Sequence, residues 1–400
     1  MKTRYSLRVY LVGAVAARAG DEASGPALML AGFALTGSTS EASSLLAGIT
    51  ISAAAGGPLL GTLLDRASRP GRLLAGALVV YAVGLGTILA GIGRLPFAVT
   101  VLIAVLTGIP APALSGGWTA QLPRVVPDVG LPRANTLDAM TYGAASLAGP
   151  ALAGGTAELL GASTAVVVSA ALVGLALPTA LMLPARPVRE HVPREASVAG
   201  DLVAGFRVIT GRPPLARVTL TSVVSSVAQG MLTACTVFLG EHVMGGAGRG
   251  AMLLSCAAVS ALVANAVLAR FPHSLAPDAI IWAGALVQAA ALVLAASEQP
   301  LLLVVAVLVL GIGEGPQLAA LFAVRHREAP EHLRGQIFTT GASLKITGFA
   351  LGVAAAGPVA TWSLRGALAL AASVAVLAAL AFFVIPSTAD SSSEDRAMPH

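Results

Sequence analysis

The stretch Gly61-Thr-Leu-Leu-Asp65-Arg66-Ala-Ser-Arg69-Pro-Gly71-Arg72 is a short charged turn between two long apolar runs. It carries four of the few charged residues in the first half of the chain. Each flanking run is about 20 residues long, which is the length that a helix needs to cross a lipid bilayer. The stretch therefore predicts two membrane-spanning helices joined by a turn at one membrane surface.

The composition of the whole chain is that of a membrane protein. Hydrophobic residues make up 56% of the sequence, charged residues only 11%, and the mean hydropathy is +0.84, whereas a soluble domain carries about 25% charged residues. Because backbone polar groups in lipid must be paired internally, only helices or closed barrels span a bilayer, and the runs lack the alternation that a barrel requires. We therefore expect an all-α polytopic membrane protein.

Twelve apolar runs are long enough to be transmembrane helices. They cover residues 9–35, 45–64, 73–92, 95–118, 135–160, 162–183, 215–239, 251–269, 279–296, 301–324, 337–362 and 367–385. These runs predict an N-terminal six-helix bundle (1–184), a cytoplasmic central loop (185–214), a C-terminal six-helix bundle (215–386) and a disordered tail (387–400). The first run is interrupted by charges and then becomes apolar again, so we expect a first transmembrane helix and no cleaved signal peptide.

The two halves of the chain contain similar short segments at equivalent places. Ala75-Gly-Ala-Leu-Val79 recurs as Ala283-Gly-Ala-Leu-Val287, and Ala148-Gly149-Pro150 recurs at the same offset as Ala356-Gly357-Pro358. This similarity suggests two related bundles, as in transporters built from parallel repeats.

The distribution of Lys and Arg predicts the orientation in the membrane. With the N-terminus inside, nineteen of these residues fall in inner segments and only Arg94, Arg249 and Arg365 in outer loops. We therefore expect both termini, the charged turn and the central loop to be cytoplasmic.

The charged turn resembles the loop signature of the major facilitator superfamily, which reads Gly, three residues, Asp-Arg, one residue, Gly and two basic residues. Gly61, Asp65, Arg66 and Arg69 match it in register, whereas Ser68 and Pro70 depart from it. With the twelve runs and the basic central loop, the resemblance covers almost the whole chain. It implies two pseudo-symmetric six-helix bundles that work by alternating access, in the cytoplasmic membrane. The turn would then be a conformational latch, in which Asp65 accepts hydrogen bonds from a neighbouring helix N-terminus or an arginine.

A second resemblance lies in the fifth run. Gly149-Pro150-Ala-Leu-Ala-Gly154-Gly155 resembles the glycine-proline signature of exporters in this family. Small residues let helices approach closely and Pro permits a bend, so ordinary tight packing is the alternative explanation. Asp138 begins the same run, and we expect it to be a structural partner for the arginines of the turn.

Four charged residues lie deep in the predicted spans, where charges are costly and usually face a cavity or a partner. At about 1.5 Å per residue, Asp21 and Glu22 lie roughly 20 Å from the inner helix end. Glu314 and Lys345 lie at a similar depth of roughly 16–17 Å on the same scale. In the family fold, the first, fourth, seventh and tenth helices line the central cavity.

The first span carries the main candidate site. Arg18, Asp21 and Glu22 follow the spacing i, i+3 and i+4, so they share a helix face and can form an ion pair. One arginine cannot compensate two carboxylates, and a carboxyl group in a low-dielectric cavity can exchange a proton for a cation. We expect Asp21 to be the main proton or cation site and Glu22 its coupled neighbour.

The other candidates come from the second half of the chain. Glu314 lies in Gly311-Ile-Gly-Glu-Gly-Pro316, whose glycines and proline loosen the helix, and the alternative for this Glu is a hydrogen bond to freed backbone groups. Lys345 can pair with Glu314 or with Asp21 in one conformation and not the other. Gln229 is a candidate substrate contact.

Several function classes have little support in the sequence. It shows no nucleophile constellation, no phosphate-binding glycine loop and no metal-spaced histidines, so we expect neither an enzyme nor a bound metal or cofactor. The two cysteines, Cys235 and Cys256, form neither a disulfide framework nor a metal cluster. Scattered basic residues do not indicate nucleic-acid binding.

We expect a monomeric secondary transporter in the lipid bilayer that uses the proton gradient to export a small amphipathic or cationic compound. Proton-coupled uptake of a metabolite, or a non-transporting sensor or partner protein, are the alternatives.

Overall fold

The computed structural model describes residues 6–185, 198–245, 247–271 and 274–385, and in these ranges it contains helices and turns but no strand. The first half contains α1 (Leu7–Thr36), α2 (Thr39–Arg66), α3 (Pro70–Gly91), α4 (Phe97–Gly108), α5 (Leu131–Leu160), α6 (Ala162–Leu175) and α7 (Leu177–Leu181). The second half contains α8 (Val198–Gly211), α9 (Pro213–His242), α10 (Ala247–Arg270), α11 (Pro277–Ala295), α12 (Pro300–Glu328), α13 (Arg334–Trp362) and α14 (Leu364–Val384).

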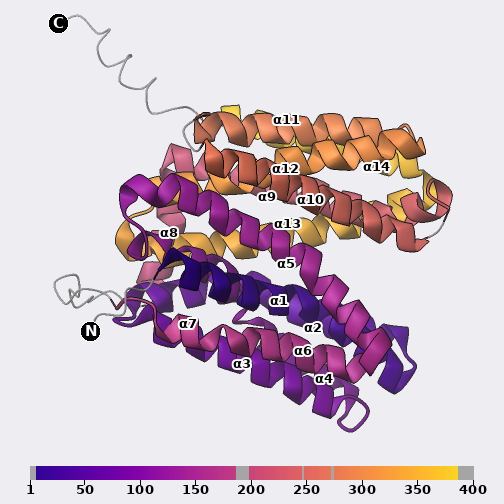
Figure 1. Ribbon diagram of the computed structural model, residues 1–400, viewed down its shortest axis with the longest axis horizontal. Helices are drawn as coiled ribbons and strands as arrows, with labels where there is room; N and C mark the ends of the chain where they lie inside the picture. The colour runs from indigo at the N-terminus through magenta and orange to yellow at the C-terminus, as the bar shows by residue number, and fades with distance from the viewer. Residues whose placement is uncertain (1–5, 186–197, 246, 272–273, 386–400) are drawn as a thin grey trace, which may run out of the picture. The chain divides into compact units, whose positions relative to one another are not determined.

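The chain forms two compact units. Unit 1 comprises Met1–Leu202 and Glu331–Thr347, and unit 2 comprises Val203–Pro330 and Gly348–His400. In unit 1, α1 packs against α5 and α6, and α2 packs against α4 (Figure 1). In unit 2, α12 packs against α10 and α11, and α14 against α9 and α11. The first half of α13 therefore groups with the N-terminal helices, which the predicted division of the chain did not include.

Local sequence signals explain where the helices begin and end. Ser38 caps α2 by accepting a hydrogen bond from the backbone N–H of Glu41 at 3.2 Å, in the S-x-x-E pattern of a capping box. Pro occupies the first turn of α3, α9, α11 and α12, where its missing N–H costs nothing. Gly37 ends α1 with a φ of 70°, a conformation that favours glycine.

Ten helices in the described residues are long and apolar enough to cross a membrane. The charged α1 and the polar α5 are not among these ten. The described chain is thus an all-α protein with apolar helices, and the count of twelve spans stays a prediction.

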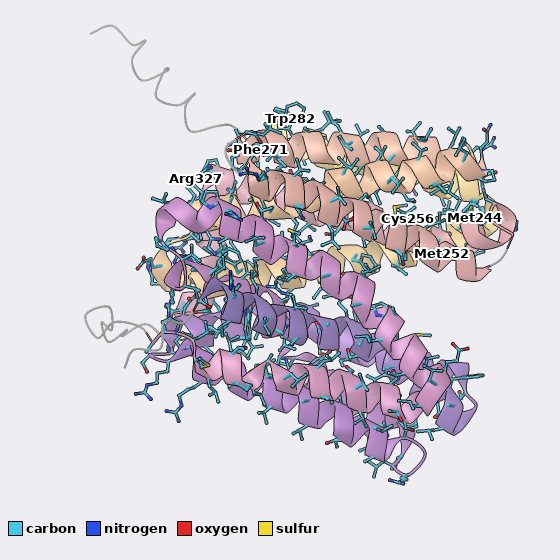
Figure 2. The ribbon with its side chains drawn as sticks, viewed as in Figure 1. Met244, Met252, Cys256, Phe271, Trp282 and Arg327 are labelled. Carbon is cyan, nitrogen blue, oxygen red and sulfur yellow. The ribbon has the colours of Figure 1, made fainter. Side chains whose placement is uncertain are left out.

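Apolar side chains also point outward from the units, as a lipid-facing surface requires. On α10, the exposed residues Met252, Val259, Val263 and Val267 recur at helical spacing, and Figure 2 labels Met252 and Phe271 among the outward side chains of this unit. In a soluble protein such a stripe would need a partner, whereas here lipid can cover it.

The predicted central loop contains a helix. Residues 186–197 of this loop and the predicted tail lie outside the described residues, but Val198–Gly211 forms α8. Asp201, Gly205 and Ile209 are buried on one face of α8, whereas Val203 and Phe206 are exposed. The four-residue spacing of the buried face is helical, and the charges of the segment hid this pattern.

Candidate functional site

The charged turn after α2 holds the start of α13. The carboxylate of Asp65 accepts two backbone hydrogen bonds, from Gly335 N–H and Gln336 N–H, each at 2.8 Å. These are N–H groups of the first turn of α13, which have no partner within the helix, and the carboxylate also complements the positive end of the helix dipole. The prediction that Asp65 accepts hydrogen bonds from a neighbouring helix N-terminus is confirmed.

Two glycines that precede Asp65 on α2 allow α2 and α13 to approach each other closely. Gly57, Gly61 and Asp65 are four residues apart and so share one face of α2. A Cβ on Gly61 would lie 2.3 Å from the Cα of Gln336, so no larger residue fits. The hydroxyl of Thr339 donates to Gly57 O at 2.6 Å. Gly61 is therefore a close-approach residue, as its place in the motif suggests.

The arginines of the turn have different environments. Arg66 Nε donates to Asp201 Oδ2 at 2.8 Å, which ties the turn to the start of α8. Arg69 is exposed to solvent. The prediction that Asp138 pairs with these arginines is wrong, because Asp138 is completely buried against α1 instead.

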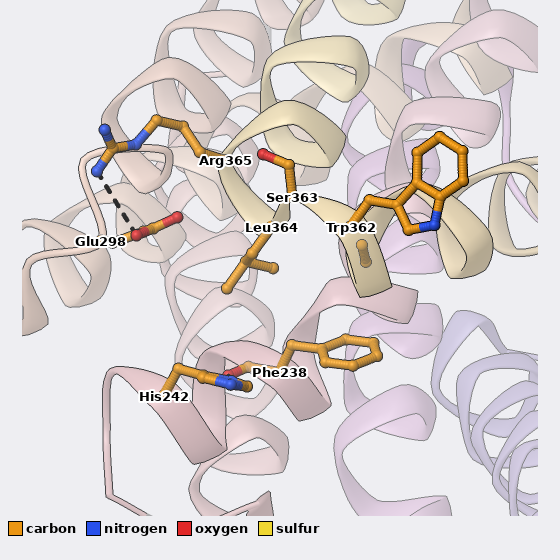
Figure 3. A pocket seen from close by; sticks show the side chains of 8 residues that line it. Phe238, His242, Glu298, Trp362, Ser363, Leu364 and Arg365 are labelled. Atoms are coloured by element: carbon orange, nitrogen blue, oxygen red, sulfur yellow. Dashed lines mark hydrogen bonds and ion pairs between the residues drawn. The ribbon is translucent and has the colours of Figure 1, made fainter.

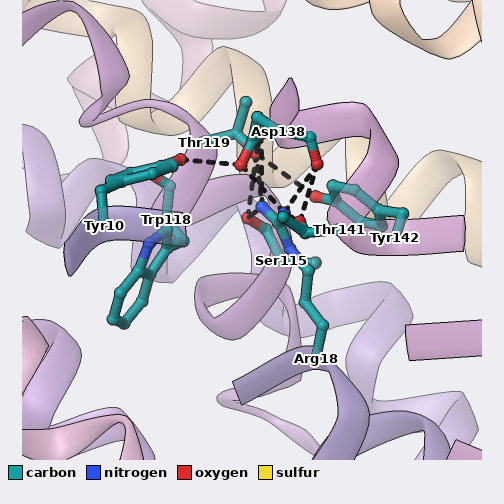
Figure 4. Close-up of polar contacts among 8 residues, drawn as sticks. All are labelled: Tyr10, Arg18, Ser115, Trp118, Thr119, Asp138, Thr141 and Tyr142. Atoms are coloured by element: carbon teal, nitrogen blue, oxygen red, sulfur yellow. Dashed lines mark hydrogen bonds and ion pairs between the residues drawn. The ribbon is translucent and has the colours of Figure 1, made fainter. Parts of the chain in front are cut away.

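Asp138 and Arg18 form a buried ion pair within unit 1 (Figure 4). Arg18 Nη1 lies 2.9 Å from Asp138 Oδ1, and the two residues are 2% and 0% exposed. Thr119 donates to the other carboxylate oxygen at 2.8 Å, and Tyr10 donates to Oδ1 at 3.0 Å. Such additional hydrogen bonds offset part of the cost of removing two charges from water.

The remaining contacts of Arg18 hold its guanidinium in place. It donates to Thr119 Oγ1 at 2.8 Å, to the Thr141 hydroxyl and to Ser115 O at 3.4 Å. It also lies over the ring of Tyr142, 3.7 Å from the centroid, in a cation–π arrangement. Ser115 belongs to a π-helical turn, Ala113–Gly117, that follows two prolines in the chain. Three segments distant in the sequence thus meet at this pair: α1, the stretch 115–119 and α5.

The ion pair that the spacing allowed between Arg18 and its helix neighbours does not form in this structure. Spacing along α1 made Asp21 and Glu22 accessible partners, but the guanidinium points to α5 and is neutralised there by Asp138. In the described residues neither carboxylate of the pair Asp21 and Glu22 forms an ion pair.

Hydroxyl groups hold Asp21 and Glu22. Tyr81 on α3 donates to Asp21 Oδ1 at 2.6 Å, and Ser24 lies 2.8 Å from the same tyrosine oxygen. Ser146 on α5 lies 3.4 Å from Glu22 Oε1. Asp21 is half-buried and Glu22 is exposed. Two adjacent acids in a predicted membrane-spanning helix are thus held by neutral donors, which can support either a carboxylate or a protonated carboxyl group.

The glycine-proline motif of α5 lies beside these acids. A Cβ on Gly149 would be 2.6 Å from Glu22 Cβ and 2.9 Å from Ala23 N, so this glycine sets the approach of α5 to α1. Gly154 and Gly155 have open space around them, and the helix continues through Pro150. Only the first glycine of the motif therefore has a packing role in the described part of the chain.

Gln229 lies in unit 2 and belongs to a set of amide side chains. Its Nε2 donates to Gln288 Oε1 at 3.4 Å, and Gln288 Nε2 donates to Gln317 Oε1 at 2.9 Å. Glu314 also lies in unit 2, whereas Lys345 lies in unit 1. The predicted pairing of Lys345 with Glu314 or Asp21 stays a prediction.

Sequence reasoning missed several residues of these sites. Tyr81, Ser24, Gln288, Gln317 and Thr119 are polar residues in apolar runs, and each makes the contact described above. A polar side chain in a transmembrane run is itself a signal, because it needs a hydrogen-bonding partner there. The sequence did not indicate which of these residues share a site.

A surface pocket of about 580 Å³ lies at one end of unit 2, where α13 and α14 meet (Figure 3). Phe238, His242, Trp362 and Leu364 line it, and Arg365 lies 3.5 Å from Glu298 at its edge. Because Arg365 is 67% exposed, solvent screens this pair. The described residues contain no group of three or more His, Cys, Asp or Glu that could hold a metal.

Comparisons with known proteins agree with this architecture. The family model of the Major Facilitator Superfamily matches residues 10–339. An uncharacterized MFS-type transporter of Sinorhizobium fredii (strain NBRC 101917 / NGR234) is 30% identical over 291 residues, which are 71% of each chain.

Solved structures share the fold. The human organic anion transporter MFSD10 has a TM-score of 0.76 at 16% identity, covering 95% of this chain and 99% of the other. The fucose:proton symporter of E. coli has a TM-score of 0.71 at 15% identity, covering 96% and 100%. At these identities the likeness concerns the fold alone.

Proposed function

Since the chain belongs to the Major Facilitator Superfamily, we propose that it exports a small amphipathic or cationic compound in exchange for protons. It is a multi-pass integral membrane protein of a transporter family, which makes secondary transport its general activity. The direction, the coupling ion, the substrate class and the location in the cytoplasmic membrane belong to the proposal.

The observation that carries the proposal is the state of the acids on α1. Asp21 and Glu22 are neighbours in α1, a predicted membrane-spanning helix, and the guanidinium of Arg18 is paired with Asp138. Acids in a membrane without a fixed counter-ion are costly and are typically functional. A cationic substrate or a proton can neutralise them in turn, which is the basis of exchange.

The two carboxylate oxygens of Asp21 have different surroundings. Tyr81 donates to Oδ1, so this oxygen acts as an acceptor. Within the described residues Oδ2 has no hydrogen-bond donor. We therefore assign Oδ2 as the atom that takes up the proton or contacts the cation, with Tyr81 and Ser24 holding the group in place.

Export is supported by the glycine-proline resemblance and by the position of Gly149 against Glu22. The same glycine that marks the motif brings α5 to the acidic pair, so a bend of α5 can change the surroundings of Glu22. Energised inside-out vesicles test the direction. An exporter accumulates its substrate there, whereas uptake in the cell, the alternative function, gives no accumulation.

The role of Asp21 is tested with a compound-sensitivity panel on cells that contain the protein, lack it or carry Asp21→Asn. We expect Asp21→Asn to abolish protection and the response of transport to external pH. Asp21→Glu keeps a titratable group and should retain part of the activity. Asp21→Asn with unchanged rate and pH dependence would exclude this site and would favour the sensor alternative.

A further inference from the structure

Three glutamines from three helices of unit 2 form a continuous chain. Gln229 lies on α9, Gln288 on α11 and Gln317 on α12. Gln317 Nε2 donates to Ile281 O at 2.9 Å, Gln288 Nε2 to Gln317 Oε1 at 2.9 Å, and Gln229 Nε2 to Gln288 Oε1 at 3.4 Å. Each amide thus donates to the next, and the chain ends on a backbone carbonyl.

The backbone carbonyl fixes the direction of the whole chain. Because Ile281 O can only accept a hydrogen bond, the side of Gln317 that faces it must be its NH₂ group. The oxygen of Gln317 then faces Gln288 and requires the NH₂ group of Gln288, and the same reasoning passes to Gln229. Flipping any one amide would oppose two donors or two acceptors.

The free end of the chain is the side-chain oxygen of Gln229. Gln229 is half-buried, and its Oε1 is not among the buried atoms without a partner. Within the described residues it receives no hydrogen bond. The oxygen is therefore open to an incoming donor, and its orientation is set before anything binds.

The chain is expensive to bury, which argues that it is more than a packing feature. Gln288 is 1% exposed and Gln317 is 7% exposed, and buried amides cost free energy unless they are hydrogen-bonded. Gly284 makes room for them, because a Cβ there would lie 3.2 Å from Gln317 Cβ and 2.8 Å from Gly313 O. Apolar side chains would fill the same space without the cost of burying three amide groups.

We propose that Gln229 Oε1 is a preset hydrogen-bond acceptor for the transported compound, and that this compound is a protonated amine carrying at least one N–H group. Gln288 and Gln317 are positioning residues that hold the acceptor. This inference rests on the proposed export of a cation and narrows it, because a quaternary ammonium ion has the same charge but no hydrogen to donate. A charged donor forms a stronger hydrogen bond than a neutral one.

Two probes of equal charge and chain length separate these cases. Purified full-length protein is titrated with dodecylamine, which is protonated at neutral pH, and with dodecyltrimethylammonium, with thermal stability as the readout of binding. We expect the wild type to prefer the amine about tenfold, as the loss of one hydrogen bond to a charged group implies. Gln229→Met should weaken only amine binding and remove the preference.

Control variants distinguish positioning from general damage. Gln299→Met makes the same substitution at an exposed glutamine at the start of α12 and should leave the preference unchanged. Gln288→Met keeps Gln229 but releases its anchor, so the preference should shrink. If Gln229→Met does not fold, Gln229→Leu removes the acceptor oxygen with a different apolar side chain and should also remove the preference for the amine.

The outcomes separate the inference from the proposed function. Equal binding of both probes by the wild type, or equal weakening of both by Gln229→Met, overturns the acceptor role and leaves cation export standing. A preference for the amine that persists in Gln229→Leu also overturns it. Wild-type protein that binds neither probe overturns the cationic substrate together with the inference.

Discussion

Asp65 shows how one carboxylate can hold a helix end. Its two oxygens accept the backbone N–H groups of Gly335 and Gln336, each at 2.8 Å. Asp65→Asn leaves one acceptor oxygen and places an NH₂ group against a backbone donor. We expect a loss of about 1 kcal/mol in stability, typical of a lost cap, seen as a lower melting temperature of the purified protein.

The same variant should change the transport rate more than the range of substrates, because the contact lies at a helix start and not at the acids of α1. The exposed Glu158→Gln is the matched control, since it replaces an acid by its amide where no described residue bonds to it. An altered substrate range at an unchanged rate would contradict the latch role of Asp65.

Substitution of Asp138 should have a larger effect on stability than substitution of Asp65. Asp138→Asn leaves the guanidinium of Arg18 buried without a compensating charge, and breaking a buried pair costs about 3–5 kcal/mol. We expect a large fall in melting temperature. The double variant Arg18→Met with Asp138→Leu should lose less than the sum of its two single changes, and an additive result would mean that the pair is not coupled.

At the scale of helices, the packing of α5 on α1 depends on a single glycine of the motif. Gly149→Ala places a methyl group 2.6 Å from Glu22 Cβ and should separate the helices, with a lower melting temperature and reduced transport. Gly154→Ala has open space around it, so it should be neutral or slightly stabilising through helix propensity. Equal effects of the two substitutions would show that α1 and α5 do not approach as described.

The helices were the most predictable part of this protein, and their side-chain partners the least. Apolar runs of transmembrane length determine where helices form, so the predicted spans 73–92 and 135–160 agree within a few residues with α3 and α5. The predicted span 95–118 covers α4 and the π-helical turn after it, and the predicted span 162–183 covers both α6 and α7. The helix α8 was missed because its charges hid an amphipathic pattern. Arg18 was paired with its neighbours on α1 because spacing along one helix is visible in sequence, whereas its actual partner lies 120 positions away.

Side-chain partners on other helices were also the reason why the candidate sites could be predicted only in part. Asp21 and Glu22 could be selected from the sequence because charges in apolar runs are rare. Tyr81, Gln288 and Gln317 could not be connected to a site, since their partners belong to other helices. Asp65 is the exception. Its place in a recognised motif predicted a hydrogen bond from a neighbouring helix N-terminus, and this contact was confirmed.

At the scale of the whole molecule, the distribution of basic residues predicts the orientation in the membrane. Nineteen Lys and Arg lie in predicted inner segments against three in outer loops, a bias that normally places the basic side in the cytoplasm. Arg69 and Arg94 flank α3, which spans Pro70–Gly91, and both are exposed. A helix of this length extends about 33 Å, so a membrane-spanning α3 would place the two positions on opposite sides of the bilayer.

Single cysteines at these two positions test the orientation directly. The background replaces the two native cysteines, Cys235 and Cys256, by alanine. In intact cells, a membrane-impermeant maleimide should label Arg94→Cys but not Arg69→Cys, and the latter should react only after the membrane is opened. Labelling of Arg69→Cys from outside would show that the orientation is the opposite of the predicted one, with the Asp65 contact on the outer surface. The direction of transport inferred from inside-out vesicles depends on this result, because the same flux has the opposite meaning in an inverted protein.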